Sequence, residues 1–475
     1  MREGKNKMTI QIYNSMTRQK ESFVPKQEGK VNMYVCGPTV YDYIHIGNAR
    51  PAIFFDVVRR YLEYKNFDVN YVVNLTDVDD RLIKKSIESG DTVPHIANKY
   101  SQAYFEDIAS LGINSATRNP RVMDHMPQII SFIEGLIAKG HAYESGGDVY
   151  FKTSSFAEYG KLSHQNLEEL QHGIRVEVGD LKQDAQDFVL WKSAKPGEIT
   201  WESPWGLGRP GWHIECSAMA KEYLGETLDI HGGGLDLQFP HHECEVAQSE
   251  CLTGKPLANY WMHNGYIHIN NEKMSKSLGN GISVRELVAK LSTEVIRYFI
   301  LATHYRSPIN FSDDTVKQAE NSVARIQTSY TNLKHRLSAM ANDEAGAVNA
   351  NIKQQLDQVV AQFEAKMNDD FNTADAITAW FELVTLTNQT LQDSEVSKAT
   401  LEALQNQFDA FNGVLGLLVK VEEQSLDAEV EQLIAERTEA RKAKNWARAD
   451  EIRDLLNEMN IVLEDTPQGI RWHRK

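Results

Sequence analysis

The pattern of apolar and polar residues in the first part of the chain alternates between strand-like and helix-like periods. Residues 31–35 and residues 67–75 are β-prone apolar runs, and residues 48–65 between them carry apolar side chains at the spacing of a helix face. This order predicts a parallel sheet, whose ligands lie beyond the carboxyl ends of its strands. Cys36 and Thr76 stand at two of those ends.

Residues 120–205 interrupt this order with glycine-rich turns and a mixed polar stretch. A strand followed by a loop returns at residues 227–234, so we expect an insertion that splits one nucleotide-type fold into two halves. After Ser312 and Asp313, an expected helix cap, the chain becomes almost wholly helical. The apolar stripe of that region predicts the core of a helical bundle. It consists of Val316, Ala319, Val323, Ile326, Tyr330, Leu333 and Leu337.

A polar, acidic stretch at residues 421–427 predicts a linker to a small last domain. That domain is expected to contain one helix, at residues 433–459, followed by a strand at residues 461–463. The fold class is therefore α/β: a Rossmann-type parallel-sheet domain split by an insertion, then a helical bundle and a small C-terminal domain. The expected segments are 1–119 and 206–270 for the two halves of the sheet domain, 120–205 for the insertion, 271–313 for a lysine-containing region, 314–426 for the bundle and 427–475 for the last domain.

A length of 475 residues, 41% of them hydrophobic, suits about three ordinary domains. No apolar run approaches the roughly 20 residues that span a bilayer, and the basic start at residues 1–7 lacks the apolar core of a secretion signal. We therefore expect a cytoplasmic protein without a membrane segment, in which Met1 or Met8 is the natural start. Four unevenly spaced cysteines do not form a disulfide framework, so reduced, buried or metal-bound thiols are expected.

The net charge of −16 argues mildly against binding to nucleic acid, but the charge is uneven. Residues 437–475 contain nine Lys and Arg against seven Asp and Glu, together with Trp446 and Trp472. Basic groups interleaved with aromatic ones can hold phosphates and stack on unpaired bases. On composition alone, a solvated surface helix is the simpler interpretation.

Two short motifs suit the phosphates of ATP. His45 and Asn48 begin and end a His-Ile-Gly-Asn run at the expected start of a helix, where free N–H groups favour phosphate and Gly47 allows close approach. Lys273 and Lys276 lie in a Lys-Met-Ser-Lys-Ser run that can neutralise charge developing on phosphates. Each motif alone has a plain alternative, a helix-capping histidine or a solvated loop. Their order along the chain favours nucleotide chemistry.

Four further residues have side chains that bind metal ions. His241 and Glu245 are four residues apart at the start of an expected helix, so they share one face, and Cys36 and Cys216 would complete a set that zinc accepts. Cys244 is a rival, because it lies three residues from His241 and can reach the same face. Three thiolates with one imidazole would form a closed structural site. Cysteines that bind no metal would simply be buried.

Taken together, several motifs give the chain a strong resemblance to a known family. From about residue 8 to residue 475 it resembles the cysteinyl-tRNA synthetases of the bacterial type, which are class I aminoacyl-tRNA synthetases. The matching stretches are Met33 to Asp42, His45 to Arg50, Asn74 to Asp80, Gly211 to Ser217, Asp229 to Gly234, Phe239 to Glu243, Lys273 to Ser277 and Met367 to Thr373.

The resemblance implies one zinc ion, held by Cys36, Cys216, His241 and Glu245, that binds the thiolate of the substrate cysteine. A zinc-bound thiol is deprotonated, whereas the hydroxyl of serine is less acidic and a harder ligand. Discrimination by a bond that the wrong substrate cannot form makes editing unnecessary. We therefore expect no editing site in the insertion.

The resemblance further implies a catalytic sheet domain, a stem-contact region at 271–313 and an anticodon-binding last domain. Its expected substrates and partners are L-cysteine, ATP with Mg²⁺ and cysteine tRNA, on a monomer without membrane contact. Thr76 and Trp212 should seat the amino acid, and His45, Asn48, Lys273 and Lys276 should be catalytic. The expected ATP contacts are Thr39, His45, Gly47, Asn48, His231, Gly232, Gly233, Gly234, Asp236 and Lys276.

Two rival functions stay open at this point. A cysteine ligase of mycothiol biosynthesis resembles this family in adenylation and zinc, but delivers cysteine to an amino sugar and would not need the residues from about 427 to 475. An inactive RNA-binding relative would keep zinc only for structure. The presence of His45, Lys273 and Lys276 argues against the inactive relative.

Overall fold

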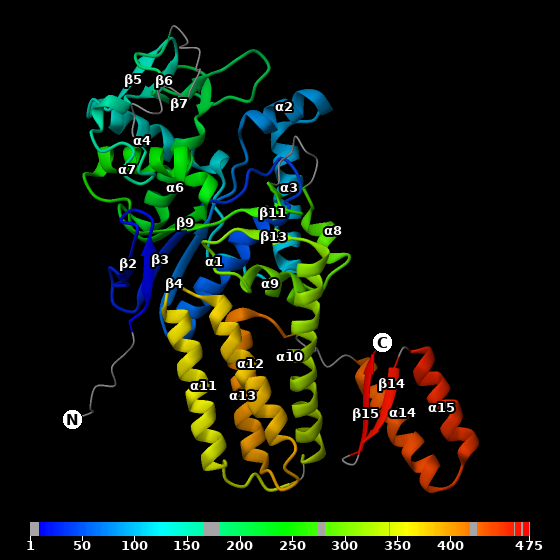
Figure 1. The fold of residues 1–475 in the computed structure, drawn as a ribbon. Helices are drawn as coiled ribbons and strands as arrows, with labels where there is room; N and C mark the ends of the chain where they lie inside the picture. The colour runs from blue at the N-terminus through cyan, green and yellow to red at the C-terminus, as the bar shows by residue number, and fades with distance from the viewer. Residues whose placement is uncertain are drawn as a thin grey trace, which may run out of the picture.

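The computed structural model describes residues 9–165, 181–273, 281–341, 343–418, 425–459, 461–466 and 469–474. A parallel sheet and its helices form the middle of the molecule (Figure 1). An antiparallel sheet covers one end, and a long helical bundle extends from the other. A small C-terminal domain follows the bundle along the chain.

The central sheet is parallel throughout and has the strand order β10-β9-β3-β4. The two expected N-terminal strands are β3 (Lys30–Val35) and β4 (Asp68–Val73), and α1 (Ile46–Tyr64) connects them. The chain beyond the insertion supplies β9 (Leu228–Gly234) and β10 (Ala258–Asn264). Segments far apart in the sequence therefore make one sheet, which confirms the predicted split fold.

The carboxyl ends of these four strands lie along one edge of the sheet. Val35 pairs with both Val73 and Gly232, and Asn264 pairs with Gly234. The start of α1 lies beside this edge, with His45 as its N-cap residue. The remaining elements of this first half of the chain are β1 (Gln11–Asn14), β2 (Gln19–Ser22), α2 (Asp80–Ser89) and α3 (Val93–Ser110).

The insertion forms an antiparallel sheet in the order β5-β6-β7-β8. Its last strand ends at Pro210, so the insertion continues beyond the expected boundary at residue 205. The sequence of that strand is Gly-Arg-Pro, and glycine and proline conceal a strand from pattern analysis. The elements here are η1 (Val122–His125), α4 (Met126–Ala138), β5 (Ala142–Ser145), β6 (Asp148–Phe151), η2 (Thr153–Ser155), β7 (Phe188–Ser193) and β8 (Gly208–Pro210).

Helices from the second half of the fold lie between the insertion and the parallel sheet (Figure 1). They are α6 (Trp212–Leu224) and α7 (Glu243–Thr253); η3 (Leu235–Leu237) and η4 (Gln238–His242) precede α7 along the chain. The apolar residues of α4, α6 and α7 share one buried core.

The lysine-containing region forms a small three-stranded sheet in the order β12-β11-β13. Its motif falls almost wholly outside the described residues: the backbone of Lys273 ends β12, and Lys276 is not described. The elements of this region are β11 (Ile267–Ile269), β12 (Glu272–Lys273), α8 (Val284–Val288), α9 (Thr293–Leu301) and β13 (Ile309–Phe311).

The helical bundle consists of α10 (Asp313–Ala339), α11 (Ala350–Asn368), α12 (Thr373–Thr390) and α13 (Lys398–Leu415). Ser312 caps α10 by accepting a hydrogen bond from the backbone N–H of Thr315. The central residues of the predicted apolar stripe are buried, so the stripe is bundle core; they are Ala319, Val323, Ile326, Tyr330 and Leu333. These residues share one continuous core with α1.

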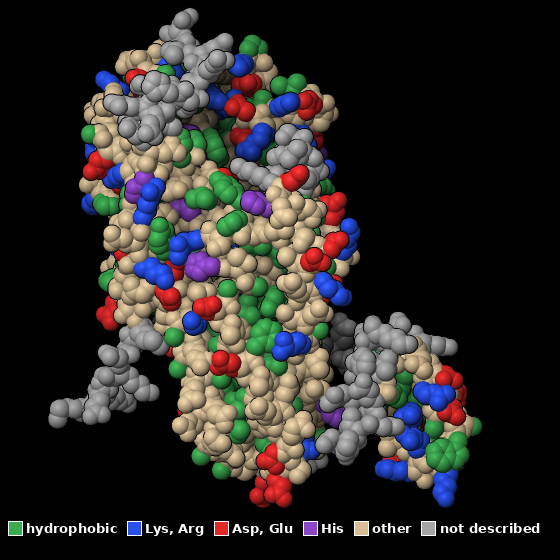
Figure 2. All heavy atoms as spheres, viewed as in Figure 1, with side chains coloured by type: hydrophobic (Ala, Val, Ile, Leu, Met, Phe, Trp, Pro, Cys, Tyr) green, Lys and Arg blue, Asp and Glu red, His purple; other side chains and the backbone are tan. Residues whose placement is uncertain are grey.

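The C-terminal domain pairs two helices, α14 (Ser425–Lys442) and α15 (Trp446–Glu458), with a hairpin of β14 (Ile461–Thr466) and β15 (Gly469–Arg474). The prediction of a single helix over residues 433–459 was wrong. Lys444 has a φ of 57°, and the side chain of Asn445 caps α15. Lys and Arg side chains gather on the visible face of this domain, beside acidic ones (Figure 2).

The first part of the expected linker, residues 421–424, lies outside the described residues, and the remainder already belongs to α14. Across the described ranges, no helix combines the length and the apolar character that crossing a bilayer requires.

Candidate functional site

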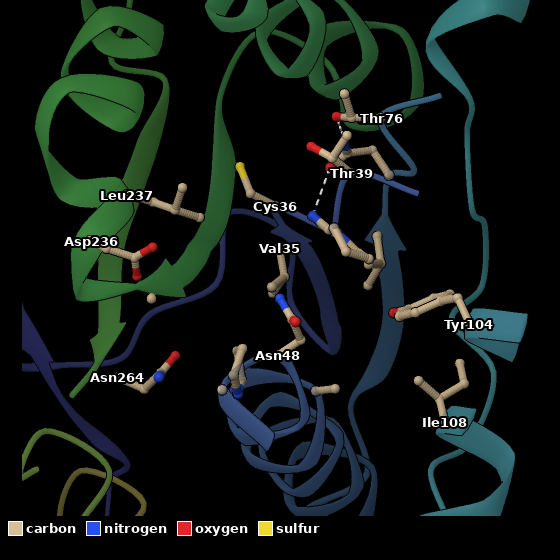
Figure 3. Close-up of a pocket in the computed structure, with 18 of the residues that line it drawn as sticks. Val35, Cys36, Thr39, Asn48, Thr76, Tyr104, Ile108, Asp236, Leu237 and Asn264 are labelled. Carbon is tan, nitrogen blue, oxygen red and sulfur yellow. Dashed lines mark hydrogen bonds between the residues drawn. The ribbon is translucent and has the colours of Figure 1, made fainter. Parts of the chain in front are cut away.

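A cavity of about 570 Å³ opens at the carboxyl edge of the parallel sheet. This is where ligands bind in folds of this kind. Three of the four expected metal ligands and most of the expected substrate contacts line it. The lining includes Cys36, Thr39, His45, Gly47, Asn48, Thr76, Trp212, Cys216, Gly234, Asp236 and His241. Figure 3 shows Asn48 near the middle of the cavity, with the sulfur of Cys36 above it.

The four expected metal ligands meet at one wall of this cavity, and their ligand atoms all lie within 4.8 Å of one another. The sulfur of Cys36 lies 3.6 Å from the sulfur of Cys216 and 3.3 Å from Oε1 of Glu245. Nε2 of His241 lies 3.1 Å from the same oxygen. Tetrahedral zinc with bonds of about 2.0–2.3 Å places its ligand atoms roughly 3.3–3.8 Å apart. The donor types and their spacing therefore fit a zinc ion.

Short polar contacts join the four ligand side chains and shift their pKa values. The hydrogen bond from Cys36 lowers the pKa of Cys216 to about 6, so Cys216 is a thiolate at neutral pH. Burial alone lowers the pKa of His241, but its hydrogen bonds to Cys216 and Glu245 raise it to about 10. Burial raises the pKa of the Cys36 thiol well above its usual value. A dication would displace the protons on Cys36 and His241, because metal binding releases protons from its ligands.

A second layer of histidines orients two of the ligands. Nε2 of His231 lies 2.9 Å from Oε2 of Glu245, the oxygen that faces away from the other ligands. Nδ1 of His213 lies 3.0 Å from Nδ1 of His241. Burial lowers the pKa of His213 to about 3, so its ring is neutral and can accept a hydrogen bond from His241. Such outer partners fix the orientation and basicity of metal ligands.

Two overlapping sets of candidate metal ligands occur among the described residues. They differ in whether their members line the cavity. The second set replaces Cys216 and His241 by His231 and His242. These two histidines are fully buried and do not line the cavity, and His242 bonds to His263 at 2.8 Å. Only the first set therefore places an ion within reach of a substrate.

The rival ligand Cys244 does not belong to either set. Its sulfur lies 3.3 Å from the hydroxyl of Tyr159, within the core that α7 shares with the insertion. Burial raises the pKa of the Cys244 thiol well above its usual value, which keeps it protonated. The structure therefore places Glu245, rather than Cys244, beside the other three ligands.

Thr76 and Trp212, the residues expected to contact the amino acid, line the same cavity as three of the metal ligands. The hydroxyl of Thr76 donates to Glu215 at 3.0 Å, and burial raises the pKa of that carboxyl well above its usual value. The ring of Trp212 is 40% exposed and lies over His241, with 4.5 Å between ring centroids. Trp212 can therefore cover a ligand without moving the core.

The start of α1 supplies polar groups to the middle of the cavity. Oδ1 of Asn48 accepts a hydrogen bond from the backbone N–H of His45 at 3.2 Å. Nδ1 of His45 has no hydrogen-bond partner among the described atoms, and burial lowers its pKa. A neutral imidazole at the start of a helix suits phosphate oxygens, which the positive end of the helix dipole also favours. Thr39 accepts a hydrogen bond from Arg81 at 2.7 Å at the same rim.

Close packing requires glycine at two positions near the end of β9, which was not evident from the sequence. A Cβ atom on Gly232 would lie 2.3 Å from the ring of Phe55, and one on Gly233 would lie 2.9 Å from the ring of His242. These two glycines allow α1 and η4 to approach the sheet. Of the expected ATP contacts on this strand, only Gly234 lines the cavity, together with Asp236 just beyond it.

Sequence analysis missed Asn264 and Tyr266, which also line the cavity. Asn264 is buried and ends β10, and its Oδ1 has no hydrogen-bond partner among the described atoms. The sequence could have predicted Asn264, because a polar residue at the carboxyl end of an apolar strand lies at the ligand-binding edge of a parallel sheet. Arg50 fixes the position of Tyr266 by donating to its backbone oxygen at 2.7 Å.

Three family models match successive parts of the chain. The model described as "tRNA synthetases class I (C) catalytic domain" matches residues 22–321. The model described as "DALR domain" matches residues 362–419. The model described as "Cysteinyl-tRNA ligase anticodon binding domain" matches residues 423–472.

Individual proteins agree with these models. The chain is 57% identical over 471 residues to a cysteine–tRNA ligase of Oceanobacillus iheyensis, an alignment that covers 98% of this chain and 100% of the relative. It is 56% identical over 467 residues to that of Staphylococcus carnosus, with the same coverage. A Mycobacterium tuberculosis methionyl-tRNA synthetase bound by methionyl-adenylate matches with a TM-score of 0.62 at 15% identity, over 82% of this chain and 92% of that one, and supports the fold alone. The chain therefore belongs to the cysteine–tRNA ligases, a family of class I aminoacyl-tRNA synthetases.

Proposed function

We propose that this protein uses ATP to activate L-cysteine as cysteinyl-adenylate and transfers the cysteinyl group to the terminal ribose of cysteine tRNA. One observation carries the proposal: Cys36, Cys216, His241 and Glu245 converge on the wall of the cavity that also contains His45 and Asn48. A thiol-binding site and a phosphate-binding site therefore share one space. ATP is proposed to enter with Mg²⁺, as other phosphoryl donors do.

We propose that the four ligands hold zinc, which supplies a Lewis acid that binds a thiolate far better than a hydroxyl. Trp212 covers the side chain of the substrate cysteine. Thr76, which donates a hydrogen bond to Glu215, binds the polar end of the substrate. His231 and His213 keep Glu245 and His241 in their ligating orientations.

In the first step, an oxygen of the cysteine carboxylate forms a bond to the α-phosphorus. The bond from that phosphorus to the bridging oxygen breaks, and pyrophosphate leaves with the electron pair. His45 and Asn48 donate hydrogen bonds to the phosphate oxygens, while Asp236 and Asn264 hold the nucleoside. Lys273 and Lys276 would neutralise the departing charge; the side chains of both lie outside the described residues. Positioning and charge stabilisation suffice for this chemistry.

In the second step, a hydroxyl of the terminal ribose of the tRNA attacks the carbonyl carbon of the adenylate. The bond from that carbon to the phosphate oxygen breaks, AMP leaves with the electron pair, and the hydroxyl proton passes to the departing phosphate. We propose that the matched C-terminal domain binds the anticodon. A mycothiol-type ligase would have no use for that domain, and an inactive relative would have no use for the open thiol site.

Zinc would bond to the thiolate of cysteine, and the hydroxyl of serine cannot form an equivalent bond. A separate editing site is therefore unnecessary. We therefore propose that the insertion, residues 120–210, releases no serine from seryl-tRNA. The protein is proposed to act in the cytosol as a monomer.

Charging of unfractionated tRNA with labelled cysteine tests the proposed function directly. We expect ATP-dependent incorporation of cysteine into tRNA, and no incorporation of serine. Adenylate formation without charging of tRNA would instead favour the ligase that uses an amino sugar. Absence of both activities in metal-replete protein would contradict the proposal.

A further inference from the structure

The turn between α11 and α12 carries the motif Met367 to Thr373, which has no role in the chemistry proposed for the cavity. It lies at the end of the bundle that meets the parallel-sheet domain (Figure 1). Asp370 and Phe371, at its centre, have φ values of 61° and 49°. Two successive left-handed residues other than glycine are costly, and such conformations cluster at functional sites. The strain indicates that the turn does more than join two helices.

The side chain of Asp370 is fully buried, and both of its oxygens contact other parts of the fold. Oδ1 accepts hydrogen bonds from the backbone N–H of Tyr13 and from the hydroxyl of Tyr305, each at 2.8 Å. Oδ2 accepts a hydrogen bond from Nε of Arg306 at 2.9 Å. Nε2 of His304 lies 3.5 Å from the same oxygen. One carboxylate of the bundle therefore binds both β1 and the connection between α9 and β13.

That connection supports the cavity wall that follows β10. The backbone oxygen of Tyr305 accepts a hydrogen bond from the N–H of Gly265 at 2.8 Å. A Cβ atom on Gly265 would lie 2.8 Å from the backbone oxygens at positions 306 and 307, so the two segments are in close contact. Gly265 lines the cavity between Asn264 and Tyr266. Tyr305 thus joins Asp370 through its hydroxyl and the cavity wall through its backbone.

The same connection leads into β13, which pairs with β11. The register joins Ile267 with Ile309 and Ile269 with Phe311. β11 pairs in turn with β12, whose last residue is Lys273. The segment that Asp370 anchors therefore also supports the strands from which the lysine motif extends.

We propose that Asp370 is a positioning residue for ATP: it anchors residues 304–306, and through them holds the cavity wall at residues 264–266 in place for the nucleoside. This inference rests on the proposed function, in which Asn264 contacts the nucleoside of ATP. Asp370 itself does not line the cavity. The four metal ligands lie outside the anchored segments, on α6, η4 and α7 and after β3. Loss of the anchor should therefore disturb ATP and spare the binding of cysteine.

Asp370→Asn removes the charge but keeps the size of the side chain, and asparagine tolerates a left-handed backbone. The amide oxygen can still accept from Tyr13 and Tyr305. The amide N–H₂ group would face Nε of Arg306, which is also a donor, so this contact is lost. Arg306 is partly exposed and can turn toward solvent. The variant should therefore loosen residues 304–306 without creating a cavity in the core.

Tyr305→Phe breaks the same anchor from the other side. It removes only the hydroxyl and leaves the ring stacked on Phe54, with 4.2 Å between ring centroids. Tyr330→Phe is the matched control, because the hydroxyl of Tyr330 donates to Asp409 within the bundle and neither residue lines the cavity. Thermal unfolding would verify that each variant is folded.

ATP–pyrophosphate exchange would be measured with ATP varied at saturating cysteine, and with cysteine varied at saturating ATP. We expect the KM for ATP to rise about tenfold in Asp370→Asn and about threefold in Tyr305→Phe, since a misplacement of about 1 Å can cost about 100-fold. The KM for cysteine and the zinc content should stay at the wild-type level. Tyr330→Phe should match the wild type throughout. A merely structural role would lower the active fraction without separating the two KM values.

An unchanged KM for ATP in folded Asp370→Asn would overturn the proposal. Equal rises in the two KM values would also overturn it, as would equal effects of Tyr305→Phe and Tyr330→Phe. If Asp370→Asn does not fold, Tyr305→Phe decides, and an unchanged KM for ATP in that variant overturns the proposal. Failure of the proposed function would look different, since the wild-type protein itself would give no cysteine-dependent exchange.

Discussion

Nε2 of His231 lies 2.9 Å from Oε2 of Glu245, and both side chains are fully buried. The hydrogen bond leaves Oε1 to face Cys36 and His241, so the orientation of Glu245 depends on a residue expected to contact ATP. His231→Ala should therefore weaken zinc binding by about 10- to 100-fold. Competition with a chromophoric chelator would measure this affinity. His95→Ala, at an exposed histidine, is the control. A raised KM for ATP with unchanged zinc affinity would instead support the nucleotide role.

Glu245 and Cys244 are adjacent in sequence but face different surroundings. Glu245→Gln should lose most of its zinc, because an amide is a poorer ligand than a carboxylate, and should lose adenylation with it. Cys244→Ser should keep zinc, because Cys244 faces Tyr159. Zinc content of the purified proteins, measured by atomic emission, checks both variants. The reverse result, with zinc retained in Glu245→Gln and lost in Cys244→Ser, would contradict the ligand assignment.

Arg50 is a buried cation that donates to three backbone oxygens, of Tyr266, Tyr305 and Ser307. Burial lowers its pKa to about 10, so it stays charged at neutral pH. Arg50→Lys cannot reproduce the fork of donors. The oxygens of Tyr266 and Tyr305 keep backbone N–H partners, so the main loss is at the oxygen of Ser307, and a buried carbonyl without a partner costs about 1–3 kcal/mol. We expect the free energy of unfolding to fall by about 1–3 kcal/mol, measured in urea by tryptophan fluorescence.

The same substitution should raise the KM for ATP, because the backbone that Arg50 holds carries Tyr266 into the cavity. Lys353→Gln, which breaks an exposed pair with Asp357, is the control and should change stability by less than about 0.5 kcal/mol. If Arg50→Lys were as stable as this control, Arg50 would not hold the cavity wall.

Trp446 begins α15 and is 59% exposed. Exposed aromatic rings can stack on unpaired bases, and the domain that carries Trp446 matches an anticodon-binding model. Trp446→Ala should lower the affinity for cysteine tRNA about tenfold and leave ATP–pyrophosphate exchange unchanged. Filter binding would measure the affinity. Leu455→Ala, at a 42% exposed position of the same helix, should bind tRNA normally. An equal loss in both variants would indicate damage to the domain rather than loss of stacking.

The parallel sheet and the bundle were predictable because their signals are local and periodic. The residues between Val31 and Val73 alternate between the two regular periods, and the stripe on α10 repeats every three or four residues. β8 was missed because glycine and proline mark loops more often than strands. The break before α15 was missed because it depends on one left-handed residue, Lys444, and on the cap from Asn445.

The first set of metal-type residues was predictable because cysteine, histidine and carboxylate side chains have few other uses together. Their supporting residues were not predictable, because these depend on which strand lies beside which helix. His231 is on β9 and Glu245 is on α7, and only the tertiary packing of these elements brings their side chains to 2.9 Å. Gly232 is required by Phe55, a residue of α1 that is remote in sequence.

The most direct test of the account is ATP–pyrophosphate exchange with cysteine and with serine, on zinc-replete and chelator-treated protein. The account predicts exchange with cysteine alone, its loss on chelation, and its recovery when zinc is restored. Cysteine-dependent exchange that survives removal of the metal would contradict a substrate-binding role for the cluster of Cys36, Cys216, His241 and Glu245.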